Sequence, residues 1–433
     1  MISNRIFGRK KSPKYILSPT QQNNFDWFVK TILFGTFISM LGIIIYYVYA
    51  LAAIKNGSSS FDWLLGIFSD FVSIMKASLS ENPYIYGKAS YPPIAIAVLY
   101  PFALICKDVF NIYKDLPLNT DELTSRIILH REFWIAMILF WGICSICIVT
   151  SLACNYKLGL KNSFKLAALT IFSSPFIYCV MRGNTIYFAL IFLLLYLFLY
   201  NSKSAFVREI SYICLVISGA IKIYPLFFGV FVLNKKRFFA AVRIALYSII
   251  LFFSSFLLYG TDFGEVICFF KNLGGFANDN ARLLETNNLS ITSLIYKLFY
   301  LTTPPSAESS LFKLTNFAVI GILFLLSAIV ASITKSNFSR SVIASSIAIL
   351  IPSVSYFYVI SIFIIPFFEF IKHYDDINGY RQKLYKLSFA FLFFTPFIMA
   401  INFIPHTIII IIVLLTEILH VIANEFINKT PAI

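Results

Sequence analysis

Charged side chains are scarce in this sequence, because Asp, Glu, Lys and Arg make up only 13% of its 433 residues. Hydrophobic residues make up 59%, whereas soluble chains contain about 45–50%. A soluble fold is therefore excluded, since a chain of this length cannot bury so much apolar surface. The apolar residues form long continuous blocks, not the alternating segments of about ten residues found in membrane barrels. We predict membrane-spanning helices, whose backbone polar groups are hydrogen-bonded within each segment.

Residues that bind metals or nucleotides are also scarce. The four histidines are scattered without ligand spacing. Cys144 and Cys147 form a CxxC inside an apolar block, but no second pair accompanies them. The sequence contains no P-loop or dinucleotide fingerprint, and Asp375 and Asp376 lie in a basic connection rather than in a DxD motif. We therefore expect no metal and no other cofactor.

The net charge of +15 does not require a nucleic-acid partner. Lys and Arg flank membrane spans on the cytoplasmic side, and the start of the chain, MISNRIFGRKKSPK, fits this rule. It is not typical of a cleaved signal, because the apolar block begins near Phe28 and has full span length. We predict a cytoplasmic basic segment over residues 1–27 and one membrane domain over residues 28–433. The bias toward Ile, Lys, Asn and Phe favours a bacterial inner membrane.

The apolar blocks suggest how often the chain meets the bilayer, since one span needs about 20 apolar residues. Two blocks contain helix-breaking interruptions, KIYP in block 210–233 and PSVSYFY in block 340–371. The predicted fold is an all-α polytopic bundle with about 10–13 transmembrane or re-entrant helices. The blocks lie at residues 28–54, 91–106, 132–153, 164–181, 185–200, 210–233, 238–258, 311–333, 340–371, 384–403 and 406–425.

The positive-inside rule then orients these blocks. We place four basic connections in the cytoplasm, so the two interrupted blocks each return to the side from which they start, as a hairpin or a broken pair. The connections 107–131 and 155–165 are both basic, so either one of the blocks 91–106 and 132–153 is partial or one connection departs from the rule. The four cytoplasmic connections are 203–208, 235–243, 335–340 and 372–386.

With this orientation, the unusual polar residues gather on the outer side. A charge inside the membrane costs on the order of 2.5–3.5 kcal/mol at a helix centre, so Lys222 needs a partner or a water-filled cavity. Broken helices are tolerated where they line such a cavity. The polar residues on the outer side are Asp70, Lys88, Arg182, Asn184, Lys222, Asn288, Ser353 and Ser355.

The order of the polar motifs resembles glycosyltransferase family 87, whose members have the GT-C membrane fold. The resemblance covers roughly residues 28–370, and each motif by itself is short. In the late motif Tyr356 stands where better-known members have tryptophan, and Phe357 and Tyr358 occupy the region of their histidines. The motifs are SDF with Asp70 in an external first loop, YPP (Tyr91 to Pro93), RGN (Arg182 to Asn184), KIYP followed by a basic cluster (Lys222 to Arg237), NNLS (Asn287 to Ser290) and SVSYFY (Ser353 to Tyr358), with Pro366 beyond it.

The resemblance implies transfer of a sugar from a polyprenyl phosphate to an acceptor hydroxyl, with inversion at the anomeric carbon. The sugar is mannose or another hexose or pentose, and the acceptor is a glycan or a glycolipid. Asp70 would be the general base. The donor phosphate would be bound by Lys222, Arg182 and Lys88. Further substrate contacts would come from Tyr91, Asn184, Asn288, Ser290, Ser355, Tyr356 and Tyr358.

Simpler interpretations of these residues remain open on residue type alone. Asp70 could cap a short interfacial helix, Arg182 could extend to the membrane surface, and Lys88 could be a solvated charge. Tyr91 with the two prolines could be an aromatic belt and a helix start. The asparagines and serines could cap helices. A transporter or lipid flippase would also contain broken helices with charge inside the membrane, but no internal repeat supports it. An oligosaccharide polymerase or ligase would have external loops rich in arginine, whereas loop 259–310 contains only Arg282.

Overall fold

The structure is a computed structural model of the chain. It describes residues 17–55, 68–85, 87–114, 116, 120–234, 237–260, 263–301, 309–377, 379–394 and 404–427. The predicted basic segment 1–27 therefore lies largely outside the described residues, as does part of the loop before Asp70. The first described helix begins at Pro19, ahead of the apolar block that starts near Phe28, because the amphipathic turns before the block continue the same helix.

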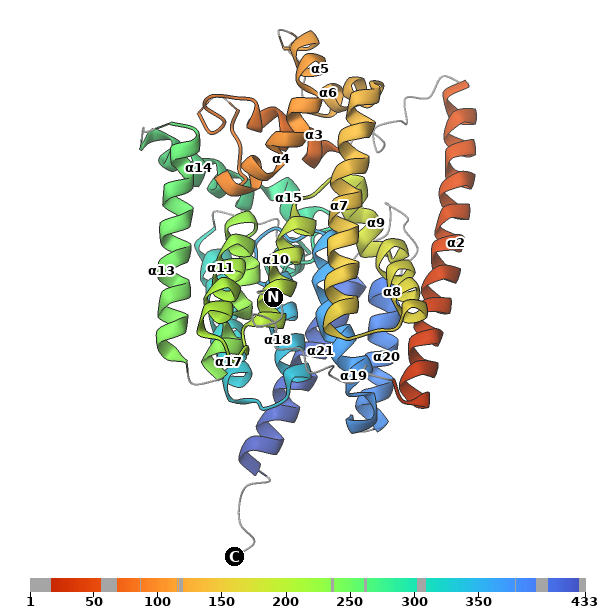
Figure 1. Cartoon of the computed structure of the whole chain (residues 1–433). Coiled ribbons are helices and arrows are strands. Elements are labelled where there is room, and N and C mark those ends of the chain that lie inside the picture. The colour runs from red at the N-terminus through yellow and green to blue at the C-terminus, as the bar shows by residue number, and fades with distance from the viewer. Residues whose placement is uncertain are drawn as a thin grey trace, which may run out of the picture.

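The described part of the chain is an all-α bundle without strands, as predicted (Figure 1). Its helices are α2 (Pro19–Lys55), α3 (Ser69–Ser78), α4 (Pro93–Ile105), α5 (Lys107–Ile112), α6 (Thr120–Ile127), α7 (Arg131–Asn155), α8 (Leu160–Phe172), α9 (Ser174–Arg182), α10 (Ile186–Leu199), α11 (Ala205–Ile221), η2 (Tyr224–Gly229), α12 (Val230–Asn234), α13 (Phe238–Ser255), η3 (Phe256–Leu258), α14 (Gly264–Ala277), α15 (Asn280–Leu284), α16 (Ile291–Tyr300), α17 (Ser310–Ile333), α18 (Asn337–Leu350), η4 (Phe357–Phe363), α19 (Ile364–Lys372), η5 (Tyr374–Asp376), α20 (Gly379–Phe394), α21 (Ile404–Ile422) and η6 (Ala423–Ile427).

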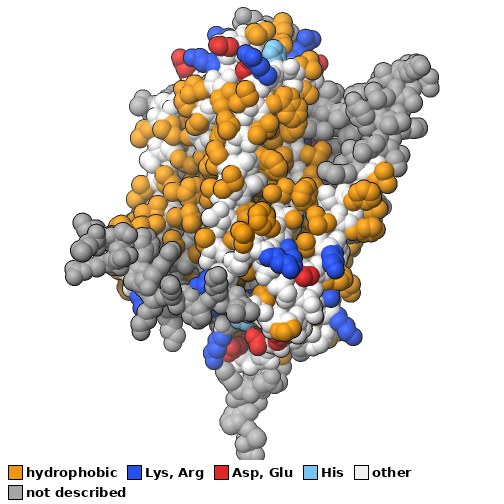
Figure 2. Space-filling model, turned by 45° about the vertical axis from the view of Figure 1, so that its right-hand side comes forward, with side chains coloured by type: hydrophobic (Ala, Val, Ile, Leu, Met, Phe, Trp, Pro, Cys, Tyr) orange, Lys and Arg blue, Asp and Glu red, His pale blue; other side chains and the backbone are white. Residues whose placement is uncertain are grey.

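The bundle has the surface of a membrane protein. Among the described residues, four helices are long and apolar enough to cross a bilayer, and the bent pair α8 and α9 makes a possible fifth. The four are 131–155, 238–258, 310–333 and 404–425. Figure 2 shows apolar side chains over the middle of the visible face, with Lys, Arg, Asp and Glu toward its two ends. The chain is therefore a multi-pass membrane protein.

Both predicted hairpins are present. α11 ends at Ile221, and η2 and α12 return the chain to its starting side, where Arg237 donates a hydrogen bond to the carbonyl of Tyr200 (2.8 Å). α18 and the pair η4–α19 make the second hairpin, since Asn337 and Glu369 meet in one small cavity at its open end. The two apices are KIYP and PSVSYFY, because a proline and polar residues end each ascending helix.

The structure also settles the connection that the charge rule left open. α4 has only 13 residues, too few for a full span. It leads into α5 and α6, which lie at the same end of the molecule as α3, and α3 packs against α6 (Figure 1). Block 91–106 is therefore the partial one, and the basic connection 107–131 departs from the rule. The connection 155–165 lies at the opposite end, with the other basic segments.

α18 occupies the centre of the bundle, and its residues are buried from Phe338 to Leu350. It packs against η2, α17, α19 and α21. α18 ends at Leu350 and packs against η2, so the segment that follows it lies next to the break between α11 and η2. This arrangement brings two irregular segments, distant in the sequence, to one place.

Candidate active site

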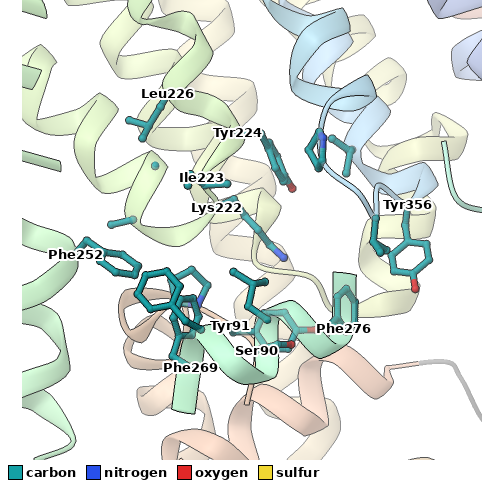
Figure 3. A pocket seen from close by; sticks show the side chains of 18 of the residues that line it. Ser90, Tyr91, Lys222, Ile223, Tyr224, Leu226, Phe252, Phe269, Phe276 and Tyr356 are labelled. Atoms are coloured by element: carbon teal, nitrogen blue, oxygen red, sulfur yellow. The ribbon is translucent and has the colours of Figure 1, made fainter. Parts of the chain in front are cut away.

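A cavity of about 490 Å³ lies where the two hairpin apices meet α3, α14, α15 and residues 90–92 (Figure 3). One part of its lining is polar and the rest is apolar. The contributing segments are α3 with Asp70, residues 90–92, the end of α9 with Arg182, the break around Lys222, η2, α13, α14, α15 with Arg282, and residues 352–359. The cavity thus collects the SDF, YPP, RGN, KIYP and SVSYFY motifs.

Asp70 stands in the first turn of α3 and is only 7% exposed. Its Oδ1 accepts a hydrogen bond from Nη2 of Arg182 at 2.6 Å, and its Oδ2 accepts one from Nδ2 of Asn184 at 2.8 Å. Burial raises the pKa of Asp70, but the charge of Arg182 and the two hydrogen bonds outweigh this effect and lower the pKa below its ordinary value. Asp70 is therefore an ionised carboxylate facing the cavity.

The RGN segment is shaped to hold that carboxylate. α9 ends at Arg182, and Gly183 has a φ of +64°, so Arg182 and Asn184 both reach Asp70. The side-chain oxygen Oδ1 of Asn184 accepts a hydrogen bond from the N–H of Ile186 (3.1 Å), which fixes the side-chain amide of Asn184 at the start of α10. Across the contact, the N–H of Phe68 donates to the carbonyl of Met181 (2.6 Å) and ties the start of α3 to α9.

We expect Gly183→Ala to destabilise the protein and to lower its activity together. A Cβ at this position would lie 2.3 Å from Cβ of Phe71, and the left-handed backbone itself costs roughly 1–2 kcal/mol for an alanine. Relief of the clash would separate Arg182 from Asp70. Thermal unfolding in detergent micelles measures the first effect, and a transfer assay measures the second.

Gly142→Ala is the matched control, because nothing lies within 4 Å of a Cβ added there. Alanine has a higher helix propensity than glycine by about 1 kcal/mol, so this variant should unfold at the same temperature as the wild type or higher. A Gly183→Ala protein as stable and active as the Gly142→Ala protein would contradict the role of the RGN turn.

Lys222 lies at the break between α11 and η2, with an extended backbone. Its Nζ lies 4.9 Å from the centroid of the Tyr91 ring, and Figure 3 shows the side chain pointing into the cavity. Among the described residues, it forms no ion pair with a carboxylate. A half-buried ammonium facing an open cavity is suited to binding an anion.

Lys88 is placed differently from Lys222. It is exposed, has a φ of +50°, and is not among the residues that line the cavity. The structure therefore does not bring it to the other predicted phosphate ligands, although it lies close to Tyr91 in the sequence. The left-handed backbone at Lys88 turns the chain so that the N–H of Ala89, the next residue, donates a hydrogen bond to the carbonyl of Pro83 (3.1 Å).

Asn288, Ser290 and Ser355 join two loops behind the cavity and are not part of its lining. The side-chain oxygen of Asn288 accepts the backbone N–H groups of Ser290 and Ser355, both at 3.1 Å. Ser290 Oγ donates to the carbonyl of Ser353 at 2.7 Å and also caps α16. These contacts hold the two loops together and so position Tyr356, which pairs with Asn288 in an isolated antiparallel β-bridge.

Tyr356 and Tyr358 do line the cavity, as does Tyr91. The ring of Tyr358 stacks on that of Tyr178, with centroids 6.1 Å apart and an angle of 19° between the planes. The hydroxyl of Tyr356 accepts a hydrogen bond from Nη1 of Arg282 at 3.2 Å. These aromatic faces and hydroxyl groups give the polar part of the cavity surfaces on which a sugar ring can pack.

Arg282 was not predicted as a site residue, although it is the only arginine in loop 259–310. Its guanidinium stacks 4.1 Å from the Phe276 ring, and its Nε lies 3.4 Å from Oδ2 of Asp279. It adds a third cation to the lining, after Arg182 and Lys222. Its isolation in a loop with few basic residues was the available signal, but only the fold shows that α15 turns it toward the cavity.

Tyr224 was also missed, within the KIYP motif itself. It lines the cavity beside Lys222, and Figure 3 shows its hydroxyl pointing inward. That hydroxyl is buried and has no hydrogen-bond partner in the part of the chain that the structure describes. A buried hydroxyl without a partner is costly, so it is expected to hydrogen-bond to whatever occupies the cavity.

We therefore expect Tyr224→Phe to lower kcat/KM about fivefold without destabilising the protein, since one hydrogen bond contributes about 1 kcal/mol. Steady-state kinetics and thermal unfolding report the two quantities. Tyr196→Phe is the matched control, because the Tyr196 hydroxyl donates to the carbonyl of Phe228 (3.1 Å) away from the cavity. The Tyr196→Phe control should lose stability and keep its activity. A Tyr224→Phe protein that loses stability but keeps its activity would rule out a ligand for Tyr224.

The remaining wall of the cavity is apolar. It is formed by residues of α13 and α14, several of which are also exposed at the molecular surface; Phe253 and Phe270 are 45% and 51% exposed. Such a wall is suited to a hydrocarbon chain. The residues are Ile249, Phe252, Phe253, Phe269, Phe270, Leu273 and Phe276. No group of three or more metal-ligating side chains occurs within the described residues.

Comparison with known proteins gives one match. A sequence profile of glycosyltransferase family 87 matches residues 90–355, which is more than half of the chain. The matched range contains Tyr91, Arg182, Lys222 and Arg282, whereas Asp70 precedes it. Comparisons with curated proteins and with solved structures gave no match.

Proposed function

The chain belongs to glycosyltransferase family 87, and we propose on this basis that it transfers a single sugar from a polyprenyl phosphate donor to a hydroxyl group of a lipid-linked or glycan acceptor. The transfer inverts the anomeric carbon. Helices α3, α14 and α15, which contribute to the cavity lining, lie at the end opposite most of the basic connections, so by the positive-inside rule we place the cavity on the outer side of a bacterial inner membrane.

One observation carries this proposal: an ionised carboxylate, a cation that forms no ion pair with any described carboxylate, and an apolar wall line the same cavity. The carboxylate is Asp70, the cation is Lys222, and the wall belongs to α13 and α14. A lipid-linked sugar phosphate needs all three surfaces. Its chain requires apolar contacts, its phosphate requires cations, and the attacking hydroxyl requires a base.

The proposed reaction is a single displacement. The acceptor oxygen attacks the anomeric carbon, its proton moves to Asp70, and the bond from that carbon to the phosphate oxygen breaks with its electron pair on the phosphate. Each carboxylate oxygen has more than one lone-pair site, so Asp70 can accept this proton while Arg182 and Asn184 remain bound. Because its pKa is low, Asp70 takes the proton late, when the acceptor oxygen has become acidic.

The phosphate charge is assigned to Lys222 and Arg282 rather than to Arg182. Arg182 forms a 2.6 Å ion pair with Asp70, so its main task is to orient the base. Lys222 lies beside Tyr91, and Arg282 contributes to the lining from α15. As the donor bond breaks, the phosphate gains negative charge, and both cations then stabilise it more strongly.

The proposal is tested with purified protein in lipid nanodiscs. A panel of undecaprenyl phosphates carrying mannose, glucose, galactose or arabinose is supplied with a bacterial membrane lipid extract, and mass spectrometry identifies products. The expected result is a mass increase of one sugar on one acceptor, with undecaprenyl phosphate released. Failure with every donor of this panel, together with transfer from a soluble nucleotide sugar, would overturn the proposed donor class.

A further inference from the structure

The segment from Asn82 to Tyr91, which leads into the cavity wall, is held by one helix. In α14, Nδ2 of Asn272 donates to the carbonyls of Tyr84 (2.9 Å) and Ala89 (3.2 Å). Two helical turns before Asn272, Oε2 of Glu265 accepts a hydrogen bond from the N–H of Tyr84 at 3.2 Å. These three bonds attach α14 to the backbone of a loop whose described residues belong to no helix or strand.

The same helix forms much of the apolar wall. Residues 265 and 272 are seven apart and share one face, which is turned toward the loop. Phe269 lies between them on this face and lines the cavity, and the adjoining face carries Phe270 and Leu273, which also line it. A hydrocarbon chain against this wall would therefore press on a helix whose neighbouring face holds the loop.

The loop in turn positions Tyr91. The hydroxyl of Tyr84 donates to the carbonyl of Tyr91 at 2.9 Å, and the Tyr84 ring packs against Phe269, with centroids 5.5 Å apart. Tyr91 lies over Lys222 and near Asp70, whose charge contributes to its electrostatic environment. A continuous set of contacts thus runs from the apolar wall through α14 and Tyr84 to the polar end of the cavity.

We propose that α14 couples occupancy of the apolar wall to the placement of Tyr91 beside Lys222 and Asp70, with Asn272 as the positioning residue. This inference rests on the proposed function in taking the occupant to be the lipid chain of the donor. Binding energy from the chain, which is remote from the reacting carbon, is then used to align the reacting groups. A donor with a shortened chain should lose kcat, not only affinity.

The kinetic test compares donors that carry the same sugar phosphate on an undecaprenyl or a citronellyl chain. For the wild type, we expect kcat to be about tenfold higher with the undecaprenyl donor. A chain that bound equally well in the ground state and the transition state would change KM alone, so a change in kcat reports the proposed coupling. Asn272→Leu keeps the branched shape of the side chain and removes both N–H donors, so this difference in kcat should disappear. Asn272→Gln, which retains the amide donor, should restore much of it.

Lys271→Ala is the matched control, since this exposed neighbour belongs to neither the loop contacts nor the cavity lining. It should keep the wild-type dependence on chain length. Should Asn272→Leu fail to fold, Tyr84→Phe removes only the bond to Tyr91 and should have the same kinetic effect. A folded variant of either kind that keeps the tenfold difference in kcat would overturn the inference.

A binding measurement separates this inference from the proposed reaction. Lys88→Cys, on the exposed part of the loop, carries an environment-sensitive fluorophore in a protein whose partly exposed Cys147, Cys154 and Cys268 are replaced by serine. Added undecaprenyl phosphate should shift the emission, and Asn272→Leu should abolish the shift. An unresponsive probe, or one that responds equally in both proteins, would overturn the coupling. This holds whether or not any sugar is transferred.

Discussion

Asp70→Asn should lower kcat by about 100- to 10,000-fold, the range that a general base contributes. The substitution keeps the shape of the side chain, and an amide oxygen can still accept the hydrogen bond from Arg182. It removes the negative charge, and with it the group that takes the proton of the acceptor hydroxyl. Donor affinity should change far less, because the phosphate contacts are assigned to Lys222 and Arg282. Single-turnover rates with a saturating donor measure this loss.

Two controls make the result decisive. Asp108→Asn changes an exposed aspartate at the same end of the molecule and should leave the rate unchanged. Because Asp70→Asn leaves Arg182 partly buried without its counter-charge, it could destabilise the fold. Asp70→Glu keeps that charge and moves the carboxylate by about one bond, which should still reduce kcat about 100-fold. Normal turnover by a folded Asp70→Asn protein would remove Asp70 as the base.

The fold could be predicted from the sequence to the extent that apolar length and charge determine it. Blocks 210–233 and 340–371 are flanked by basic residues on both sides and interrupted by proline, so the charge rule required each block to turn back at its interruption, as a hairpin or a broken pair. α4 shows the limit of this reasoning. Its block is nearly as apolar as a span, but it is too short, and only packing of the neighbouring α3 against α6 shows that the chain turns back.

The site could be predicted as a group of residues on one side, but not as a set of contacts. Side-chain chemistry identified Asp70, Arg182 and Lys222 as scarce polar groups in apolar surroundings. The sequence could not show that Arg182 binds Asp70, because 112 residues separate the two. Nor could it separate Lys88 from Lys222, since the backbone turn at Lys88 depends on the contacts of the loop with α14.

Local sequence also cannot distinguish a residue that contacts a ligand from one that holds a loop. Asn288 and Tyr356 both belong to motifs of the family pattern. In the structure, Asn288 bonds backbone groups on two loops, and Tyr356 faces the cavity. Both can be equally constrained in sequence, for different physical reasons. Substitution of Asn288 would therefore displace Tyr356 rather than delete a sugar contact.

Lys222→Met should raise the donor KM by roughly 10- to 100-fold, since a hydrogen bond to a charged group contributes about 1.5–3 kcal/mol. Methionine keeps an unbranched chain of similar length and removes the charge. The protein itself should be as stable as the wild type or more so, because Lys222 pairs with no carboxylate among the described residues and its partial burial is unfavourable. Inhibition by undecaprenyl phosphate should weaken in the same proportion, which tests the phosphate contact without the sugar.

Lys88→Met is the control for this prediction, because both lysines were expected from the sequence to bind the phosphate. If the cavity geometry decides the matter, Lys88→Met leaves the donor KM unchanged and Lys222→Met raises it. If general positive charge near the membrane surface attracts the donor, both variants weaken binding by similar factors and the effect falls with added salt. Equal effects of the two substitutions would therefore refute a specific phosphate site at the α11–η2 break, whereas an effect confined to Lys222 would locate it there.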